Sequence, residues 1–237
     1  MAGFCLFAPL SEAFVKLLGD TLPLAFVVFA RFAAPLLLIR TTLWRNRHDI
    51  WMHPRRIKLM IIRSILHVTA ISCFFLSLRY LPLADALAIA YVMPFIILSI
   101  GWFTGEKANR IQFALCVLGF AGSMMVVQPS FEKVGWPAFL PLCVAFLFSG
   151  FVIITRRISQ HIDPIELQAM NGILVCSLLI PLLITGTFAG WGEISFAPVT
   201  QTQFYYLLGV GLLGTLAHVS MTYGLKMAPT SVLAPVQ

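Results

Sequence analysis

The sequence L-R-Y-L-P-L-A-D-A-L-A-I-A at residues 78–90 returns near the end of the chain as L-K-M-A-P-T-S-V-L-A-P-V-Q at residues 225–237. Both stretches read leucine, a basic residue, a bulky apolar residue, one spacer, then proline and a run of small residues. A second pair, F-V-K-L-L-G-D-T-L-P at residues 14–23 and I-T-R-R-I-S-Q-H-I-D-P at residues 154–164, matches at a similar spacing. The sequence therefore predicts two copies of one unit, residues 1–128 and residues 129–237.

The composition indicates a membrane protein. Of the 237 residues, 59% are hydrophobic and 11% are charged, whereas soluble domains have about 45–50% apolar and about 25% charged residues. A helix needs about 20 mostly apolar residues to cross the hydrocarbon layer. Eight such windows are present, with a ninth just begun, at residues 2–18, 22–42, 58–78, 82–103, 110–128, 136–155, 165–185 and 203–225. Because these windows are continuously apolar rather than alternating, they predict an all-α polytopic membrane protein and not barrel strands.

Each unit would contain five spans, an odd number, so the second unit would enter the membrane from the opposite side. The two units would then be inverted repeats related by a pseudo-two-fold axis in the membrane plane. Spans one to three should superpose on spans six to eight. In this register the second unit stops early in its fourth span and lacks a fifth. We therefore expect a truncated second repeat, with eight full spans plus the start of a ninth, as a piece of a longer protein.

The net charge of +7 is unevenly distributed among the predicted loops. Lysine and arginine are concentrated at the even-numbered loops, as Arg45, Arg47, Arg55, Arg56, Lys58, Lys107, Arg110, Arg156, Arg157 and Lys226. The odd-numbered loops hold only Arg79 and Lys133. Positively charged short loops stay in the cytoplasm. The even loops and the N-terminus are thus predicted to be cytoplasmic, in an integral protein of the bacterial inner (cell) membrane whose partner is the lipid bilayer and not nucleic acid.

The middle of the first unit resembles a known repeat. It reads P-L-A-D-A-L-A-I-A-Y-V-M-P-F-I-I-L-S-I-G-W-F-T-G-E at residues 82–106 and R-I-Q-F-A-L-C-V-L-G-F-A-G-S-M-M-V-V-Q-P at residues 110–129. This sequence is similar to the EamA-type repeat of the drug/metabolite transporter superfamily, with its proline and small residues opening the fourth span, a proline midway, and Gly-Glu at the cytoplasmic end. A-F-V-K-L-L-G and V-V-F-A-R-F, at residues 13–19 and 27–32, resemble the first two spans. The Gly-Glu of the second copy and the tenth span are absent from this sequence.

The resemblance implies a secondary transporter that moves small metabolites or drugs by alternating access between the repeats. Export of amino-acid-like or related polar metabolites is the expected activity, and uptake or exchange of a nucleotide-like or S-adenosylmethionine-like compound is the alternative. A polytopic membrane enzyme or a non-transporting scaffold would be a different class. We find no H-E-x-x-H, G-x-S-x-G or P-loop sequence and therefore predict no enzyme, no metal site and no cofactor. Self-association into a homo-oligomer is left open.

Charged residues inside the first three predicted spans are candidate functional residues, because a charge in the membrane is costly. Glu12 and Lys16 are four residues apart on the first span, so they can pair, or Lys16 can instead extend to the outer interface. Arg31 lies near the middle of the second span and needs a carboxylate or helix-end carbonyls as partners. It could tie helices together or contact an anionic substrate, and we favour the tie between helices. We interpret His67, four residues after Arg63, as a hydrogen-bonding group between helices rather than a proton carrier.

Four other side chains inside predicted spans are candidates to line a substrate cavity. The complete predicted substrate-binding set is Glu12, Lys16, His67, Tyr91, Asn171, His218 and Tyr223. Pro94 and Pro235 are expected to interrupt helical hydrogen bonding within their spans. Asp85 follows Pro82 and is interpreted as a residue that stabilises the start of a helix. The five cysteines form no close pair in the sequence, and we interpret them as packing residues.

Overall fold

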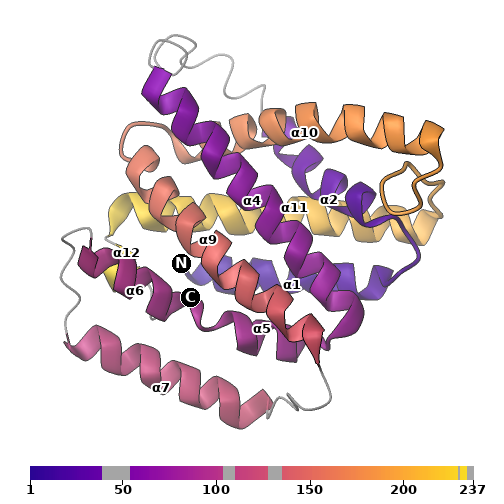
Figure 1. Ribbon diagram of the computed structural model, residues 1–237. Coiled ribbons are helices and arrows are strands. Elements are labelled where there is room, and N and C mark those ends of the chain that lie inside the picture. The colour runs from indigo at the N-terminus through magenta and orange to yellow at the C-terminus, as the bar shows by residue number, and fades with distance from the viewer. Residues whose placement is uncertain (39–53, 104–109, 128–134, 229, 234–237) are drawn as a thin grey trace.

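The computed structural model describes residues 1–38, 54–103, 110–127, 135–228 and 230–233, and within these ranges the regular structure is helical, without a strand (Figure 1). The all-helical class predicted from the sequence is confirmed. The helices are α1 (Ala2–Leu18), α2 (Leu24–Ala33), η1 (Ala34–Leu38), α4 (Pro54–Tyr80), α5 (Leu83–Ala90), α6 (Met93–Phe103), α7 (Arg110–Val127), η2 (Trp136–Ala138), α9 (Phe139–Ser159), α10 (Pro164–Ala189), α11 (Gln201–Met227) and α12 (Thr230–Leu233).

Each window predicted to cross a membrane contains a helix. Among the described residues, five segments are long and apolar enough to span a bilayer: Arg55–Tyr80, Leu83–Ile100, Trp136–Ser159, Pro164–Ala189 and Gln201–Met227. Leu24–Leu38 and Arg110–Gly122 are apolar but shorter, and α1 has 17 residues. Several residues singled out from the sequence lie outside the described ranges, namely Arg45, Arg47, Glu106, Lys107, Lys133 and Pro235.

The sequence explains where the long helices of the second half begin. α10 starts at Pro164. Proline is tolerated at this position because the N–H that it lacks would have no acceptor within the first turn of the helix. The Asp163 carboxylate accepts a hydrogen bond from the Ile165 N–H at 2.9 Å and so caps the helix. α11 starts with a capping box, in which the side chains of Thr200 and Gln203 each accept from the other residue's backbone N–H.

The fourth predicted span is divided into two helices. α5 ends at Ala90 and α6 begins at Met93. Pro94 lies in the first turn of α6 and has no N–H to donate to the Ala90 carbonyl, so one helical hydrogen bond is missing at the junction. A proline does not by itself end a helix in this bundle, because α1 continues through Pro9 and α10 through Pro181. The interruption predicted at Pro94 is confirmed, and it leaves Tyr91 at the junction of the two helices.

Two antiparallel helix pairs form the centre of the bundle (Figure 1). In the α1–α11 pair, the Ser11 hydroxyl donates to the Val210 carbonyl at 2.9 Å. In the α4–α9 pair, the Tyr80 ring at the end of α4 contacts the Trp136 ring just before α9, with 5.4 Å between ring centroids. α2 packs against α10, and both pack against α11. Each central pair therefore joins one helix from the first half of the chain to one from the second half.

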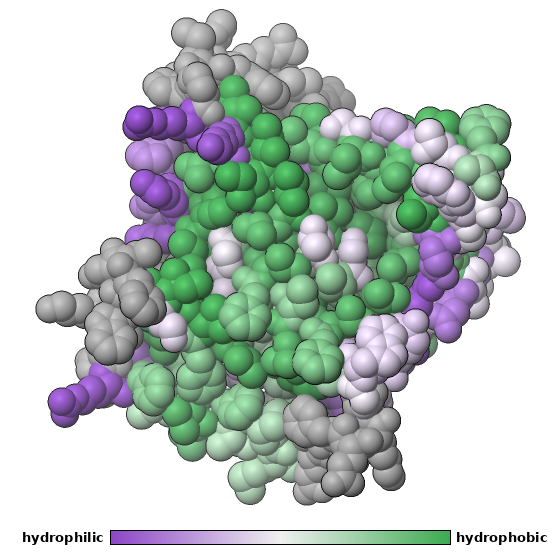
Figure 2. Space-filling view, viewed as in Figure 1, coloured by the Kyte–Doolittle hydropathy of each residue, from purple (hydrophilic) through white to green (hydrophobic). Residues whose placement is uncertain are grey.

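The bundle has two polar ends with an apolar middle. α1 and α4 finish, and α9 and α11 begin, at one end, which we name the Lys16 end; the opposite end is the Arg156 end. Figure 2 shows an apolar surface between hydrophilic residues at the left and right edges. Exposed aromatic side chains lie at the Lys16 end, namely Tyr80, Trp136, Trp191 and Tyr205. Tyrosine and tryptophan favour the membrane–water interface. The bundle is therefore suited to span a bilayer, with its apolar middle in the hydrocarbon layer and its two polar ends in water.

Candidate substrate cavity

A cavity of about 230 Å³ lies between the two central helix pairs and the junction of α5 with α6. Its walls come from α1, α4, α5, α6, α9 and α11. The lining is mostly apolar and includes the rings of Phe4, Phe74, Tyr91 and Phe148. Two side chains with strongly polar groups, Glu12 and His218, also reach it. Apolar walls with a few placed polar groups are typical of a site for a small organic ligand.

Glu12 supplies the carboxylate of the cavity. Its side chain is partly accessible, but its Oε2 atom is buried and has no hydrogen-bond partner. The charge of Arg31 on α2 acts on this carboxylate. Burying a carboxylate oxygen without a hydrogen bond is unfavourable. A molecule in the cavity that donates a hydrogen bond to Oε2 would therefore be stabilised there.

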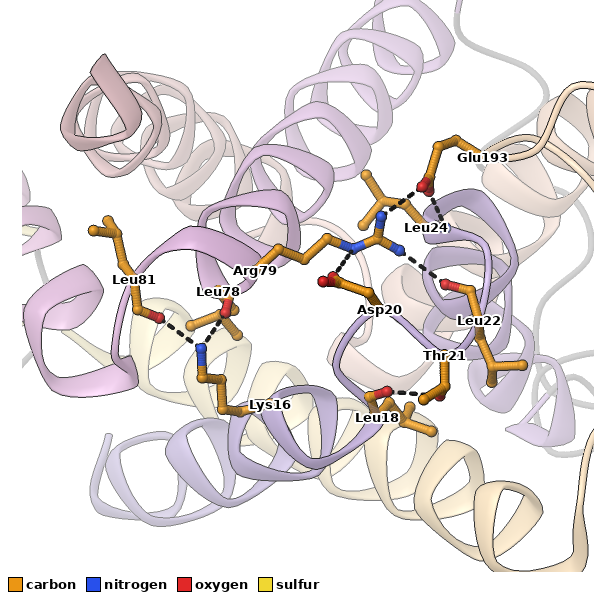
Figure 3. A network of polar contacts seen from close by, with 10 residues as sticks. All are labelled: Lys16, Leu18, Asp20, Thr21, Leu22, Leu24, Leu78, Arg79, Leu81 and Glu193. Carbon is orange, nitrogen blue, oxygen red and sulfur yellow. Dashed lines mark hydrogen bonds and ion pairs between the residues drawn. The ribbon is translucent and has the colours of Figure 1, made fainter. Parts of the chain in front are cut away.

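Lys16 does not pair with Glu12 but bonds to the end of another helix. Its Nζ atom donates to the Leu78 carbonyl at 2.5 Å and to the Leu81 carbonyl at 2.9 Å (Figure 3). These carbonyls lie in the last turn of α4 and just after it, where a helix runs out of N–H donors. Of the two interpretations of Lys16, the structure agrees with the second, in which the side chain extends toward the end of the span. The helix-end carbonyls there accept the hydrogen bonds of the ammonium group.

Arg79 forms a second set of contacts at the Lys16 end (Figure 3). Its guanidinium lies 3.1 Å from an Asp20 carboxylate oxygen and 2.7 Å from one of Glu193, and it donates to the Leu22 carbonyl at 2.8 Å. Glu193 also accepts from the Leu24 N–H at 3.0 Å. Desolvation acts to raise the pKa of the Glu193 carboxyl, but the hydrogen bonds from Arg79 and Leu24 and the charge of Arg79 outweigh it, so this pKa is lowered. We call this group of contacts the Arg79 clasp.

Beside the cavity, buried polar side chains connect several helices. Arg31 on α2 donates from Nη2 to the Gly214 carbonyl at 2.7 Å, and the Nδ1 atom of His218 on α11 is 3.0 Å from the same oxygen. His218 Nε2 is 3.0 Å from Nε2 of His67 on α4. His67 Nδ1 is 3.1 Å from Nδ2 of Asn171 on α10. None of these four side chains is more than 4% exposed, so we call them, with Arg63, the buried polar chain.

Arg63 forms the far end of the buried polar chain. Its Nη1 atom donates to Asn171 Oδ1 at 3.3 Å, and its Nε atom donates to Thr155 Oγ1 at 2.8 Å. The Ser64 hydroxyl donates to the same Asn171 oxygen at 3.0 Å. The guanidinium also lies 4.6 Å from the centroid of the Phe151 ring, and its Nη2 atom is buried without a hydrogen-bond partner. Arg63 thus connects α4 with both α9 and α10.

One placement of the hydrogen atoms satisfies the links from Asn171 through His67 to His218. The Asn171 Oδ1 atom accepts hydrogen bonds, so its Nδ2 donates to His67 Nδ1. His67 then carries its hydrogen on Nε2 and donates it to His218 Nε2. The hydrogen of neutral His218 is then on Nδ1, which donates to the Gly214 carbonyl that also accepts from Arg31. The Arg31 Nη2 atom lies 2.7 Å from the same Nδ1 atom, so two donors lie close together at this end of the buried polar chain. Both histidines are neutral in this placement, since a proton added to His67 Nδ1 or to His218 Nε2 would face another donor.

Glycines on α11 allow α2 to come close. A Cβ atom at Gly214 would lie 2.2 Å from Nε and Cζ of Arg31, and one at Gly211 would lie 2.8 Å from the Cβ atom of Ala34, where η1 continues from α2. Both distances are shorter than atomic contact permits. Small residues one turn apart let membrane helices approach closely. Here they also give Arg31 access to the α11 backbone.

The structure brings together some of the predicted substrate-binding residues. Three of them line the cavity: Glu12, Tyr91 and His218. His67 and Asn171 lie beside it in the buried polar chain. Lys16 lies at the end of the bundle, and Tyr223 is 40% exposed on α11 and is not part of the cavity lining. Arg31 ties α2 to α11, as the sequence interpretation expected.

Other features had little signal in the sequence. The aromatic lining was not singled out, because the chain has 20 phenylalanines and their spacing does not mark those at the cavity. The histidine partner of His67 was missed because His218 is 151 residues away. The fold also brings Cys73 on α4 near Cys143 on α9, although the two residues are far apart in the sequence. Asp85 lies in the first turn of α5, without a side-chain bond that caps it.

A mostly apolar cavity with one carboxylate, inside a helical bundle, is typical of a site for a small organic molecule. The EamA-like transporter family matches residues 1–128, more than half of the sequence. The chain belongs to this family and so to the drug/metabolite transporter superfamily. Family membership and the names of the relatives point to a transporter rather than an enzyme.

Curated relatives and a solved structure are similar over most of the chain. The pseudopaline exporter CntI of Pseudomonas aeruginosa is 26% identical over 225 residues, which cover 94% of this chain and 76% of that protein. A riboflavin transporter of Rhizobium johnstonii is 26% identical over 189 residues, covering 79% of this chain and 58% of that protein. A solved crystal structure aligns with this chain at 18% sequence identity and a TM-score of 0.71. The alignment covers 99% of this chain and 82% of the chain in that structure, which shows a shared fold.

Proposed function

We propose that this chain is a secondary transporter that exports small amino-acid-like or related polar metabolites through the central cavity, by alternating access between two inverted repeats. The observation that carries the proposal is the position of Glu12. Its unpartnered Oε2 atom belongs to a residue that lines a cavity between the α1–α11 and α4–α9 pairs. Such a carboxylate, enclosed by aromatic rings, suits a substrate with an ammonium or other N–H donor on a compact apolar body.

The size of the cavity supports a small substrate. Pockets for drug-sized ligands have volumes of about 300–1,000 Å³, and this cavity has about 230 Å³. The relatives named for pseudopaline export and for riboflavin transport carry different compounds. Their names support transport of a small organic metabolite but do not choose among such metabolites. Glu12 and the aromatic lining are therefore the basis for proposing an amino-acid-like compound.

The arrangement of the helices supports the inverted repeats. In the repeat register of the sequence, α1 corresponds to α9 and α4 corresponds to α11. The α1–α11 pair thus has the α9–α4 pair as its counterpart, and both are antiparallel central pairs. Transporters of this architecture bind substrate where the repeats meet and rock one part against another. We propose the same for these two pairs, in a bacterial inner membrane with the N-terminus in the cytoplasm and the Lys16 end outside.

Transport assays in proteoliposomes test this function. Vesicles containing the chain are loaded with one member of a panel of unlabelled amino acids and polar metabolites, and counterflow of the radiolabelled compound is measured with and without a pH gradient. We expect counterflow of at least one compound with a primary amine, reduced about tenfold or more in Glu12→Gln, since charged hydrogen bonds contribute about 1.5–3 kcal/mol.

The matched control is Tyr223→Phe, which removes a hydroxyl from α11 outside the cavity and should leave counterflow unchanged. Absence of counterflow across the whole panel, or equal counterflow by Glu12→Gln, would contradict the proposed substrate site.

A further inference from the structure

Two basic side chains make the same kind of contact at opposite ends of the bundle. At the Lys16 end, Lys16 near the end of α1 donates to the Leu78 and Leu81 carbonyls at the end of α4 (Figure 3). At the Arg156 end, Arg156 near the end of α9 donates to the Leu225 carbonyl and, at 3.0 Å, to the Lys226 carbonyl at the end of α11. Each cation therefore satisfies carbonyls that the last turn of a helix leaves without N–H donors.

The two contacts occupy corresponding positions in the sequence repeat. Lys16 is the third residue of F-V-K-L-L-G-D-T-L-P, and Arg156 is the third residue of I-T-R-R-I-S-Q-H-I-D-P. Their acceptors correspond as well, because Leu78 and Leu225 are the first residues of the two stretches that repeat at 78–90 and 225–237. Donor and acceptor thus recur together, which a chance surface contact would not be expected to do.

Both contacts join the same two helix pairs. The Lys16 contact connects α1, of the α1–α11 pair, to α4, of the α4–α9 pair. The Arg156 contact connects α9, of the second pair, to α11, of the first. The cavity lies between these pairs, and all four helices line it. A bond at either end therefore holds the two helix pairs together at that end, while the pairs can still separate at the other end.

We propose that Lys16 and Arg156 are paired gating residues, each closing one end of the cavity by bonding the C-terminal carbonyls of a helix in the opposite pair. This inference rests on the proposed alternating access. Opening toward the Lys16 end requires the Lys16 contact to break while the Arg156 contact holds, and opening toward the Arg156 end requires the reverse. With both contacts formed, as in this structure, the two helix pairs are joined at both ends.

Secondary contacts strengthen each gate differently. At the Lys16 end, the Arg79 clasp also connects the end of α4 to the α1–α2 connection through Asp20 and to the α10–α11 connection through Glu193. At the Arg156 end, the Gln160 side chain donates from Nε2 to the Lys226 carbonyl at 3.3 Å. Because the Lys16 end has two charged contacts from the clasp in addition to Lys16, loss of Lys16 alone should open it less completely than loss of Lys16 and Arg79 together.

The accessibility of Cys5 tests the gates without a substrate. Cys5 on α1 lines the cavity and is also exposed on the surface of the bundle. In a membrane, lipid covers that surface, so a membrane-impermeant thiol reagent reaches Cys5 through the cavity. Its modification can be measured separately from that of the other cysteines by mass spectrometry of its peptide. The reagent is added to right-side-out and to inside-out membrane vesicles containing the full chain. Lys16→Gln should raise the modification of Cys5 from the Lys16 side about fivefold and lower it from the Arg156 side. A change of about fivefold corresponds to about 1 kcal/mol in a two-state equilibrium. Arg156→Gln should produce the opposite change.

Matched variants distinguish a gate from a general effect of charge. Arg157→Gln removes a neighbouring exposed cation at the same end and should leave the labelling as in the unmodified chain. Lys16→Arg keeps a cation that can bond to the same carbonyls and should restore the original pattern. The double variant Lys16→Gln/Arg79→Gln should show more modification of Cys5 from the Lys16 side than Lys16→Gln alone. Thermal unfolding in detergent identifies any variant that is misfolded, and in that case Lys16→Met and Arg156→Met are compared instead.

The outcomes separate this inference from the proposed function. Opposite shifts for Lys16→Gln and Arg156→Gln support the gates, whether or not any compound of the metabolite panel is transported. Shifts in the same direction, or no shift in folded variants, overturn the gates even if counterflow is normal. Absence of counterflow with opposite labelling shifts would count against the proposed substrate class alone.

Discussion

The Nε2 atom of His67 on α4 lies 3.0 Å from the Nε2 atom of His218 on α11, so the two rings meet between the central helix pairs. Their centroids are 4.5 Å apart, and the His67 ring also stacks on Phe151 with 4.2 Å between centroids. Each ring is also contacted at its other nitrogen, His67 by Asn171, and His218 by the Gly214 carbonyl and by Arg31 Nη2. This contact joins the two pairs within the bundle, whereas the Lys16 and Arg156 contacts join them at its ends.

The central position of Asn171 in the buried polar chain leads to the first prediction. Asn171→Leu removes the donor to His67 and the acceptor for Ser64 and Arg63, all of which are buried. We expect a loss of about 1–2 kcal/mol of stability, the range for interhelical hydrogen bonds in membranes. Thermal unfolding in detergent measures it. Ser177→Ala on the same helix, which removes only an exposed bond to the helix's own Leu174 carbonyl, should be close to neutral; equal losses would contradict this role of Asn171.

A second prediction concerns the space beside Arg31. In Gly214→Ala the new methyl group would lie 2.2 Å from the Arg31 guanidinium, so α2 and α11 must separate or Arg31 must leave its carbonyl acceptor. We expect a loss of about 1–3 kcal/mol, as in other overpacked interiors. Gly122→Ala on α7, where no atom lies within 4 Å of the new Cβ, is the control. A Gly214→Ala protein as stable as Gly122→Ala would show that the contact between α2 and α11 is looser than described.

The Arg79 clasp gives a prediction about pH. The pKa of Glu193 is lowered in the folded chain, so the unfolded chain takes up the proton first as the pH falls. The contribution of Glu193 to stability is therefore complete above the ordinary glutamate pKa of about 4.3 and is lost as the pH falls through the lowered folded value. Unfolding curves measured from pH 7 down to about pH 3 should show this loss. Glu193→Gln should lack this component; identical pH profiles for both proteins would exclude a contribution from the carboxylate.

The membrane orientation is tested by cysteine labelling at two positions on opposite ends. Gly192 lies in the exposed connection between α10 and α11 at the Lys16 end, and His161 lies after α9 at the Arg156 end. With the even loops in the cytoplasm, an impermeant reagent added to intact cells should modify Gly192→Cys but not His161→Cys. The reverse pattern would invert the proposed topology. A cysteine at Asn46 would test the same orientation outside the described residues.

The sequence by itself determined the class, the positions of the helices and several of their ends. Continuous apolar windows define membrane helices because the cost of burying a segment in lipid is a sum over its own residues. The hydrogen bond missing at Pro94 also follows from the sequence, since the absent N–H belongs to that residue. The division of the fourth span does not follow from a proline alone, because Pro9 and Pro181 lie inside continuous helices. Family membership also follows from the order of residues along the first half of the chain.

Only the tertiary structure decided which groups meet. Glu12 and Lys16 are one helical turn apart, yet Lys16 bonds a carbonyl 62 residues away and the Oε2 atom of Glu12 is left without a partner at the cavity. His67 finds its partner 151 residues away. The physical reason is that a polar group in a membrane must be satisfied by whichever helix faces it. That neighbour is fixed by how whole helices pack, and no local stretch of sequence contains it.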